Sequence, residues 1–255
     1  DGSLLHRDTF KFDTIKDYIS NLVDQGIIII PNSSKTEKEI EKFNEELSVK
    51  LPYISENGSS IQGLNLINNN FPNKIILSRE KDELLKIFIN KVPEQLRDKC
   101  VQISKMNKKE QEKIFGQKDD NLKNALNRKY TLPFLFKGNK NEKNKLLKIL
   151  NSSSLTLQEG GRVLNLCDSI NKVKSMNKVV KILKKTEDKI KSIAVGDNYN
   201  DLDMLKNSDI PCLVFNEKFK LDQINIDNLI FSNKPSPEGW ADVIKMALAK
   251  VDLNY

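Results

Sequence analysis

The chain has 255 residues and a formal net charge of +7, with 38% hydrophobic and 30% charged residues. This length allows one large domain or two modest ones with a buried core. The longest apolar run, residues 27–30, is far shorter than the roughly 20 residues that cross a bilayer, which argues against a membrane protein. The lysines are mixed with Asp and Glu and form no stripe with aromatic residues, so the charge favours solvated helix faces over nucleic-acid binding.

The first part of the chain shows the pattern of an α/β unit. Helical spacing of apolar residues predicts a helix over residues 12–23, which Gly26 ends. The β-branched run at residues 27–30 predicts a parallel strand covered on both faces. The polar turn at residues 32–36 follows, and then a helix with one apolar side (Ile40, Phe43, Leu47). This order indicates a Rossmann-like, doubly wound sheet.

The same pattern returns near the end of the chain. We predict helices around 176–183, through Leu202 and Leu205, and over 237–250, with strands at 190–195, 210–215 and 229–231. Between the two halves, residues 73–169 contain lysine- and glutamate-rich helices and short strands near 74–77, 133–136, 155–158 and 163–166. We therefore predict an α/β core formed by residues 1–72 and 170–255, with an α+β cap domain inserted at 73–169.

The few cysteines and the single histidine exclude several kinds of chemistry. Cys100, Cys167 and Cys212 lie far apart with no histidine cluster nearby, so neither a disulfide framework nor a zinc site is expected. A reducing, cytoplasmic location follows from this pattern. Because His6 is the only histidine, we expect carboxylates to transfer protons.

A Gly-Asp-x-x-Asn-Asp turn follows the predicted strand at 190–195. Asp197 and Asp201 leave the strand end within one helical turn of each other. Two carboxylates this close need a cation to offset their charge when buried, and hard oxygen ligands suit Mg²⁺. A helix cap formed by Asp197 and Asn198 is the alternative, but it does not explain the second carboxylate. The turn therefore predicts a magnesium site, beside which Asn200 could orient a phosphate or a loop.

Ligands of open α/β sheets bind beyond the carboxyl ends of the strands. Asp1, Ser33, Asp197 and Asp201 each follow a predicted strand or the expected position of one, so we expect them to meet in one crevice. Ser33 and the amides of the following helix could bind a phosphate oxygen. The alternative is a helix cap in which Glu37 closes a capping box on Ser34.

Two further groups of residues could bind an anion. Gly160 and Gly161 would allow a close backbone approach, and Arg162 offers a bidentate fork for a carboxylate or phosphate, although a simple hairpin turn is the alternative. A lysine is also needed to balance the charge of a phosphoryl group and its nucleophile, and the candidates are Lys172, Lys174 and Lys178.

The N-terminal string Asp1-Gly2-Ser3-Leu4-Leu5 resembles the end of the Asp-x-Asp-Gly-Thr/Ser signature of haloacid-dehalogenase-type phosphohydrolases. In that signature the first aspartate is the nucleophile and the second is the general acid/base. The resemblance implies that Asp1 is the second aspartate and a metal ligand. We therefore expect the nucleophile to precede Asp1, and we expect this N-terminally truncated chain not to turn over by itself.

Several separated strings resemble one branch of that superfamily, the mannosyl-3-phosphoglycerate phosphatases. They are Ser33-Ser34-Lys35-Thr36, Glu56-Asn57-Gly58, Arg128-Lys129-Tyr130-Thr131-Leu132-Pro133-Phe134, Gly160-Gly161-Arg162 and Pro237-Glu238-Gly239-Trp240. The resemblance implies magnesium-dependent hydrolysis of mannosyl- or glucosyl-3-phosphoglycerate to the glycosylglycerate, a compatible solute, through a phosphoaspartate. It also implies that Ser33 and a catalytic lysine act on the phosphate, and that Lys35, Arg128 and Arg162 grip the glycerate or sugar.

The catalytic lysine remains open at this stage. An ungapped count from Arg162 aligns Asn171-Lys172-Val173-Lys174 with the family's Asp-Lys-Gly-Lys, which favours Lys172, but Val173 replaces the glycine and keeps Lys174 as an alternative. The substrate has alternatives too. A sucrose- or trehalose-phosphate phosphatase, or a non-catalytic protein that binds a phosphorylated metabolite, would share the same patterns. The sequence does not predict the oligomeric state.

Overall fold

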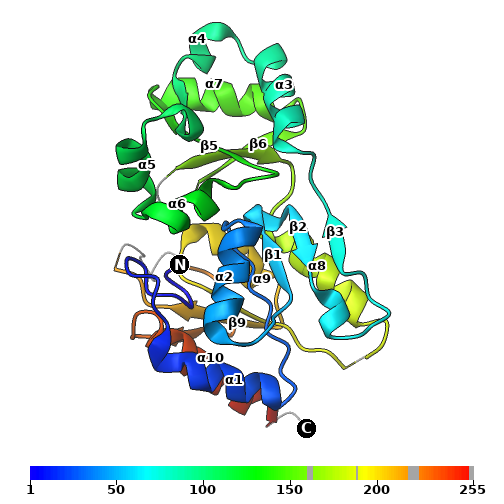
Figure 1. The fold of residues 1–255 in the computed structure, drawn as a ribbon. Helices are drawn as coiled ribbons and strands as arrows, with labels where there is room; N and C mark the ends of the chain where they lie inside the picture. Colours follow the sequence, from blue (N-terminus) through cyan, green and yellow to red (C-terminus); the bar gives the residue numbers. More distant parts are fainter. Residues whose placement is uncertain (160–162, 188, 218–223, 253–255) are drawn as a thin grey trace. The chain divides into compact units, whose positions relative to one another are not determined.

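The computed structural model describes residues 1–159, 163–187, 189–217 and 224–252 (Figure 1). The strands of this part of the chain form three sheets, and the residues group into two compact units. Unit 1 consists of Asp1–Ile29 and Met176–Tyr255, and unit 2 is Ile30–Ser175. Among the described residues, no helix is both long and apolar enough to cross a membrane.

Unit 1 is built on a parallel three-stranded sheet in the order β10-β9-β8. The strands are β8 (Ile193–Gly196), β9 (Ile210–Val214) and β10 (Ile230–Ser232). The short helices η5 (Tyr199–Asp201) and α9 (Leu202–Lys206) connect β8 to β9. Helix α10 (Glu238–Asp252) packs against β9 and β10. Its Trp240 meets Tyr18 of α1 (Lys16–Asp24) edge to face, with ring centroids 6.3 Å apart, and η1 (Asp13–Ile15) leads into α1.

The first part of unit 2 is a small antiparallel sheet with one helix against it. The strands β1 (Tyr53–Ser55), β2 (Ser60–Gln62) and β3 (Lys74–Ile76) pair in chain order. The tight turn η2 (Glu56–Gly58) connects β1 to β2, and the turn η3 (Leu64–Leu66) follows β2. Helix α2 (Glu37–Leu47) packs against β1, and a single parallel bridge joins Asn32 to Ile54 of β1.

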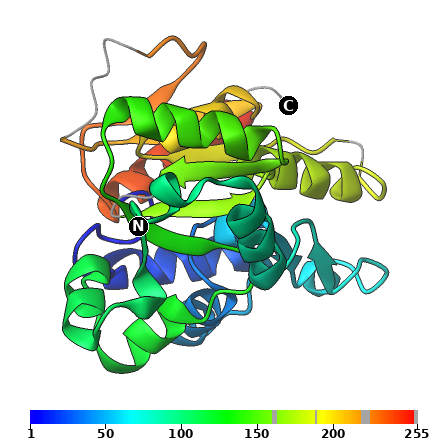
Figure 2. The same ribbon diagram turned by 90° about the horizontal axis from the view of Figure 1, so that it is seen from above.

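The second part of unit 2 is a four-stranded antiparallel sheet in the order β4-β5-β7-β6. The strands are β4 (Cys100–Gln102), β5 (Leu132–Phe136), β6 (Leu155–Glu159) and β7 (Leu164–Asp168). Helices α3 (Lys81–Lys91) and α7 (Lys140–Asn151) cover one face, and Figure 2 shows the green helix α7 lying along the strands. Leu84, Phe88, Leu146, Leu150 and Leu166 form the centre of this core.

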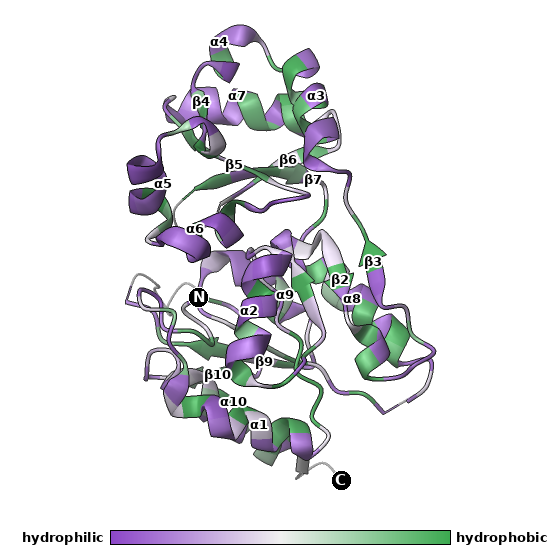
Figure 3. Ribbon diagram, viewed as in Figure 1, coloured by the Kyte–Doolittle hydropathy of each residue, from purple (hydrophilic) through white to green (hydrophobic). Residues whose placement is uncertain are grey.

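The remaining helices of unit 2 are short or lie at its borders. They are α4 (Glu94–Arg97), η4 (Ile103–Lys105), α5 (Lys108–Phe115) and α6 (Asp119–Leu126). Helix α8 (Lys172–Leu183) begins in unit 2 and continues into unit 1. Helices such as α7 carry hydrophobic residues on one side and hydrophilic ones on the other, as Figure 3 shows by colour, which is the pattern of a helix packed on a sheet.

Most of the predicted elements are confirmed. Helix α1 follows the predicted helix at 12–23, α2 buries Ile40, Phe43 and Leu47, and β8, β9, β10 and α10 lie where the sequence predicted them. The strands β3, β5, β6 and β7 also match their predicted positions. The strands β1, β2 and β4 were not predicted, and each of them has only three residues.

The predicted strand at residues 27–30 was wrong. This segment has no regular pairing, and Ile28 is 44% exposed. The Ile27 N–H donates to the carbonyl of Leu22 at 3.0 Å, as part of the end of α1, and the first pairing along this segment occurs at Asn32. A β-branched run forms a strand only where a neighbouring strand takes its backbone hydrogen bonds, and the described residues offer none here.

The boundaries of the two compact units differ from those of the predicted domains. The structure divides the chain after Ile29 and after Ser175, whereas the sequence reasoning placed the cap at residues 73–169. Residues 30–72 group with the four-stranded sheet because hydrogen bonds connect Ser34, Thr36 and Glu56 to residues 124–131. The predicted boundaries of core and cap, at residues 73 and 169, stay a prediction.

Candidate active site

The acidic turn directly follows β8, the strand at one edge of the parallel sheet in unit 1. Strand β8 ends at Gly196, and the next residue, Asp197, is only 4% exposed. Asp201 is 3% exposed, and its Oδ2 accepts a hydrogen bond from the Asp197 N–H at 3.2 Å. A Cβ at Gly196 would lie 2.4 Å from the Cβ of Asp201, so only glycine allows this close turn. The two carboxylates are therefore held together in a buried site.

Asn198 supplies the cap of the following helix. Its Oδ1 accepts from the Tyr199 N–H at 2.8 Å, and Asn198 is the N-cap of η5. The alternative in which Asp197 caps this helix does not apply, because its carboxylate binds other groups. Asn200 lies in the same turn, and its side chain is exposed.

The beginning of the chain packs against Asp197. The Ser3 hydroxyl donates to Asp197 Oδ1 at 2.7 Å, and the Arg7 guanidinium forms an ion pair with Asp197 Oδ2. Gly2 has φ +84°, and a Cβ there would lie 2.4 Å from Asp197 Oδ2. Asn216, which follows β9, donates to the Asp197 carbonyl at 2.9 Å. Asp1, which is exposed, directly precedes this contact.

Burial raises the pKa of Asp197 above its usual range, and the charge of Asp201 raises it further. The hydrogen bond from Ser3 and the charge of Arg7 act in the opposite direction without cancelling the effect. A site that penalises its own carboxylate charge in this way gains from an added cation.

The described residues hold no cluster of three or more His, Cys, Asp or Glu side chains suited to a metal. Asp197 and Asp201 nevertheless fit a divalent cation as two hard oxygen ligands, because they are adjacent, buried and of the same charge. The main-chain carbonyl of Asp1 could be a third ligand, because the next residue, Gly2, lies close against Asp197.

A second group of functional side chains lies in unit 2, at the turn formed by residues 32–36, which we call the Ser33 turn. The Ser33 N–H donates to the Ile54 carbonyl at 3.0 Å, and Ser33 Oγ accepts from the Lys35 N–H at 3.2 Å. The helix cap is Thr36, which forms a capping box with Glu39. The capping box expected between Ser34 and Glu37 was therefore wrong, and neither Ser33 nor Ser34 caps α2.

The Ser33 turn carries an excess of positive charge. Lys35 Nζ lies 3.2 Å from Glu39 Oε1, and Arg128 Nη1 donates to the Ser34 carbonyl at 3.1 Å. Burial acts to raise the pKa of Glu39, but the charges of Lys35 and Arg128 outweigh it and lower that pKa. Two cations thus lie near one buried carboxylate, so the summed charge of these three groups is positive.

Arg128 also has an unused donor. The residue is 8% exposed, and its Nε has no hydrogen-bond partner among the described residues. Its Nη1 donates to Ser34 and to the Thr131 hydroxyl. A buried N–H without a partner costs free energy, so this group calls for a bound water, ion or ligand as its partner.

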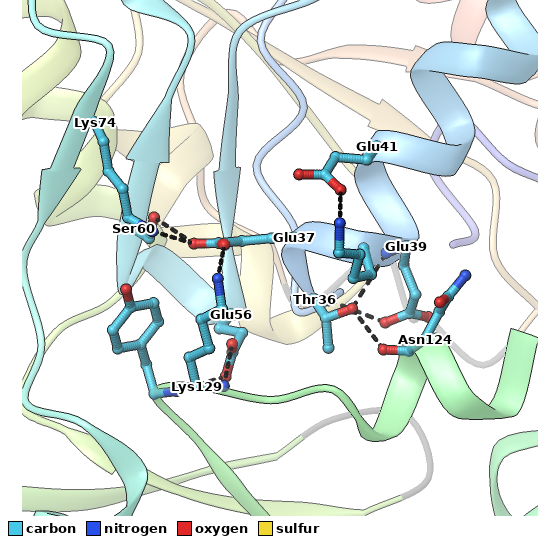
Figure 4. A network of polar contacts seen from close by, with 11 residues as sticks. Thr36, Glu37, Glu39, Glu41, Glu56, Ser60, Lys74, Asn124 and Lys129 are labelled. Atoms are coloured by element: carbon cyan, nitrogen blue, oxygen red, sulfur yellow. Dashed lines mark hydrogen bonds and ion pairs between the residues drawn. The ribbon is translucent and has the colours of Figure 1, made fainter.

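Glu37 has a different role from the predicted one. Figure 4 shows its carboxylate between Ser60, Lys74 and Lys129. The distances are 3.2 Å to Ser60 Oγ and 3.1 Å to Lys74 Nζ, and Lys129 forms an ion pair with the other oxygen. Burial acts to raise the pKa of Glu37, but the two lysines outweigh it and lower that pKa.

Glu56 belongs to the Glu56-Asn57-Gly58 string, for which the sequence predicted no role. Its side chain is fully buried, with Oε1 accepting from the Lys129 N–H at 2.8 Å. Its Oε2 accepts from the Tyr130 N–H at 3.1 Å and from the Thr131 hydroxyl at 2.7 Å (Figure 4 includes this carboxylate). Glu56 therefore holds the segment that follows Arg128.

Lys172 lies at the first position of α8, next to the Ser33 turn. Its carbonyl accepts from Asn32 Nδ2 at 3.0 Å, which joins this helix start to the residue before Ser33. The alternative lysine, Lys174, is exposed, and its Nζ donates to the Ser169 carbonyl at 2.6 Å. Ser33, Lys35, Arg128 and Lys172 thus belong to one local region of unit 2.

Two parts of the predicted site are not settled by this geometry. Gly160, Gly161 and Arg162 lie outside the described residues. The acidic turn belongs to unit 1 and the Ser33 turn to unit 2, so their expected meeting in one crevice stays a prediction.

Paired buried carboxylates after a parallel strand, together with a cationic turn at a helix N-terminus, are typical of the class of α/β enzymes that act on phosphorylated compounds. Residues 1–225 match the family described as haloacid dehalogenase-like hydrolase, and the chain belongs to this family.

Curated relatives share its length. The chain is 26% identical over 264 residues to a glucosyl-3-phosphoglycerate/mannosyl-3-phosphoglycerate phosphatase of Persephonella marina, an alignment covering 99% of this chain and 96% of the relative. A protein of the same name from Methanococcoides burtonii is 29% identical, with 98% and 95% covered. A mannosyl-3-phosphoglycerate phosphatase of Pyrococcus horikoshii is 28% identical, with 86% and 89% covered.

Solved structures show the same fold. A phosphatase of the haloalkanoate superfamily from Bacteroides thetaiotaomicron has a TM-score of 0.69 at 17% identity, covering 96% of this chain and 91% of its own. A haloacid dehalogenase-like hydrolase from B. subtilis has a TM-score of 0.66 at 16% identity, with 96% of each chain covered. The predicted fold class, a Rossmann-like α/β core with a cap, is confirmed by these likenesses. The family match and the phosphatase relatives also confirm the prediction of a phosphoric monoester hydrolase.

Proposed function

We propose that this enzyme hydrolyses glucosyl- or mannosyl-3-phosphoglycerate to the glycosylglycerate and phosphate. The observation that carries the proposal is the buried side chain of Arg128, which contacts the Ser33 turn and whose Nε has no hydrogen-bond partner among the described residues. A glycosyl-3-phosphoglycerate has two anionic groups, its phosphate and its glycerate carboxylate, and so requires more than one cationic contact. The names of the full-length relatives from Persephonella marina and Methanococcoides burtonii support the same substrates.

The acidic turn is the proposed magnesium site. Asp197 and Asp201 would hold the ion through their carboxylates, and Asp1 through its main chain, in the arrangement that the sequence predicts. When bound, Mg²⁺ would offset negative charge on the phosphoryl group that is transferred. Ser3 and Asn216 would orient Asp197 for this role through their hydrogen bonds.

Asp1 is the proposed general acid and base. In its acid form it would protonate the glycerate oxygen that leaves the phosphorus, and as a carboxylate it would then take a proton from the water that hydrolyses the phosphoaspartate. The nucleophile that forms the phosphoaspartate is expected before Asp1. The contact of Gly2 and Ser3 with Asp197 supports this assignment, because it puts the main chain next to Asp1 against the acidic turn.

The Ser33 turn is the proposed anion site. The Ser33 hydroxyl and the Lys172 ammonium would bind phosphate oxygens, while Lys35 and Arg128 would bind the glycerate carboxylate. Lys172 is favoured over Lys174, because the Lys174 ammonium is exposed and donates to the Ser169 carbonyl. Asn200 and the Gly160-Gly161-Arg162 string complete the proposed set of substrate contacts.

A panel of phosphate esters tests the proposal, with the enzyme including the residues that precede Asp1. The panel contains both glycosyl-3-phosphoglycerates, sucrose 6-phosphate, trehalose 6-phosphate and 3-phosphoglycerate, each assayed with Mg²⁺ and with EDTA. We expect kcat/KM to be highest for a glycosyl-3-phosphoglycerate. Equal rates on every ester would remove the assignment, a preference for a sugar phosphate would support that alternative, and no turnover at all would support a non-catalytic binding protein.

The Arg128→Gln variant sharpens this test. Because sucrose 6-phosphate and trehalose 6-phosphate have no carboxylate, loss of Arg128 should raise KM for the glycosyl-3-phosphoglycerates selectively. Lys137→Gln, which removes a lysine just after β5 outside the proposed site, serves as the matched control.

We also propose a cytoplasmic location and a small-molecule substrate as the only partner of the site. Cys100, Cys167 and Cys212 are free thiols, and burial raises the pKa of each to about 12. Thiols in this state are unreactive and need no oxidising compartment, which supports the proposed location.

A further inference from the structure

We propose that Glu56 is a positioning residue that sets the affinity of the anion site through Arg128. This inference deepens the proposed function and rests on it. Glu56 is fully buried, and nothing in its sequence motif assigns it a task. Its carboxylate accepts three hydrogen bonds, all of them from the three residues that directly follow Arg128.

The shape of this contact explains why a carboxylate is needed. The Lys129 N–H binds Oε1 at 2.8 Å, while the Tyr130 N–H binds Oε2 at 3.1 Å. The side chain thus accepts from two successive backbone amides with its two oxygens, which fixes the direction of the chain between them. A glutamine would turn an NH₂ group toward one of these N–H groups and would lose that hydrogen bond.

Thr131 carries the effect of Glu56 back to the arginine. The Thr131 hydroxyl donates to Glu56 Oε2 at 2.7 Å and accepts from Arg128 Nη1 at 3.0 Å. Because the hydroxyl proton is used on Glu56, the oxygen lone pairs of Thr131 face the guanidinium. The same Nη1 donates to the Ser34 carbonyl, so the guanidinium is held against the Ser33 turn, with Nε left for a ligand.

The backbone at Glu56 is strained in a way that fits such a role. Glu56 has φ +44° and Asn57 has φ +61°, although neither is glycine. A residue in this conformation costs free energy and persists only where the surroundings determine it. Gly58 follows with φ +102°, and a Cβ there would lie 2.5 Å from the Asn171 carbonyl, one residue before Lys172. The turn at Glu56–Gly58 therefore contacts both the segment that follows Arg128 and the residue that precedes Lys172.

The test measures the binding of 3-phospho-D-glycerate by calorimetry, since this compound carries both the phosphate and the carboxylate. Wild type is compared with Glu56→Gln, Glu56→Asp, Arg128→Ala and the double variant Glu56→Gln/Arg128→Ala. The matched control is Asp168→Asn, because Asp168 is also a partly buried carboxylate in unit 2 that accepts several hydrogen bonds, here from Arg79. Thermal melting of each variant checks that it is folded.

We expect Glu56→Gln to weaken binding about tenfold, and Glu56→Asp, which keeps the charge, to recover part of that loss. In the Arg128→Ala background, Glu56→Gln should change the affinity less than twofold, because the positioned group is already absent. Asp168→Asn should lower the melting temperature without changing the affinity.

Three results would overturn the inference. They are an unchanged affinity in Glu56→Gln, equal losses from Glu56→Gln with and without Arg128, and absence of binding to wild type. The proposed function is tested separately by the ester panel. A wild type that binds 3-phosphoglycerate but shows no preference for the glycosyl esters would remove the proposed substrate and leave the role of Glu56 intact.

Discussion

The Ser3 hydroxyl donates a hydrogen bond of 2.7 Å to Asp197 Oδ1, and the two residues are 194 positions apart in the chain. This contact brings the first residues of unit 1 to the end of β8, where the acidic turn begins. The N-terminal string and the acidic turn resemble two parts of one catalytic signature. Their contact in the fold supports the proposal that Asp1 and Asp197 serve the same reaction.

Gly2→Ala should disturb the acidic turn, whereas Gly26→Ala should not. Both glycines have nearly the same φ, +84° and +83°, so alanine at either position should cost about 1–2 kcal/mol of stability. Only the Cβ at position 2 would lie 2.4 Å from Asp197, while nothing lies within 4 Å of a Cβ at position 26. The clash adds to this loss at position 2, so urea unfolding should show a larger loss in Gly2→Ala than in Gly26→Ala, and phosphatase assays should show a defect in Gly2→Ala alone. Equal activity in the two variants would show that the approach of Gly2 to Asp197 has no catalytic value.

Asp197→Asn should stabilise the folded protein near neutral pH. The folded state raises the pKa of Asp197 above the unfolded value near 3.8, so its ionised form is disfavoured on folding. The wild type therefore loses stability as the pH rises from about 3.8 through the raised pKa, and Asp197→Asn does not suffer this loss. We expect a gain of about 1 kcal/mol at pH 7 that disappears at low pH, measured by urea unfolding.

Asp209→Asn should change the stability at pH 7 in the opposite direction from Asp197→Asn. Burial acts to raise the pKa of Asp209, but the N–H and hydroxyl of Ser192 outweigh it and lower that pKa. This carboxylate contributes stability above the unfolded value, so its removal should destabilise the protein at pH 7. If both variants lost stability at pH 7, the ionised Asp197 would not be unfavourable in the fold.

Glu37→Gln should destabilise unit 2 relative to wild type more at neutral pH than in acid. The pKa of Glu37 is lowered below its ordinary value of about 4.5, because Lys129 and Lys74 outweigh the effect of burial. Its stabilising contribution is therefore present above pH 4.5 and is lost as the pH falls through the lowered pKa. We expect a loss of about 1–2 kcal/mol at pH 7 that shrinks below pH 4.5. Glu46→Gln removes an exposed partner of Lys42 and should change the free energy of unfolding by no more than about 0.5 kcal/mol.

Thr36→Ala should cost more stability than Asn139→Ala, although both residues form capping boxes. Thr36 caps α2 and also donates to the Asn124 carbonyl at 2.8 Å, whereas among the described residues the Asn139 side chain bonds only to the start of α7. A lost cap costs about 1 kcal/mol, and the second hydrogen bond of Thr36 adds about the same. Denaturant midpoints should therefore differ by the equivalent of about 1 kcal/mol. Equal losses would mean that the hydrogen bond to Asn124 contributes nothing.

Periodicity and strand–turn–helix order predicted the parts of the fold that depend on local sequence. The apolar side of α2 is visible in Ile40, Phe43 and Leu47 because a helix repeats every 3.6 residues. The acidic turn was visible because two carboxylates follow an apolar strand. The β-branched run at residues 27–30 led to a wrong prediction, because a strand forms only beside a second strand and no local pattern shows whether one is present.

The details of the Ser33 turn could not be predicted from local spacing. Ser34 and Glu37 have the spacing of a capping box, and so do Thr36 and Glu39 two positions later. The choice between them depends on Lys74 and Lys129, which bind Glu37 from 37 and 92 positions away. Glu56 escaped the sequence reasoning for the same reason, because its partners lie 73 to 75 positions along the chain.

The most direct measurement is the release of phosphate from a glycosyl-3-phosphoglycerate by the enzyme that includes the residues preceding Asp1, as wild type and as Asp197→Asn, with Mg²⁺ and with EDTA. We predict turnover by wild type only when Mg²⁺ is present, and a fall in kcat/KM of at least about 100-fold in Asp197→Asn. Wild-type turnover in EDTA, or an Asp197→Asn enzyme as fast as wild type, would contradict the account of the acidic turn as the metal centre of this phosphatase.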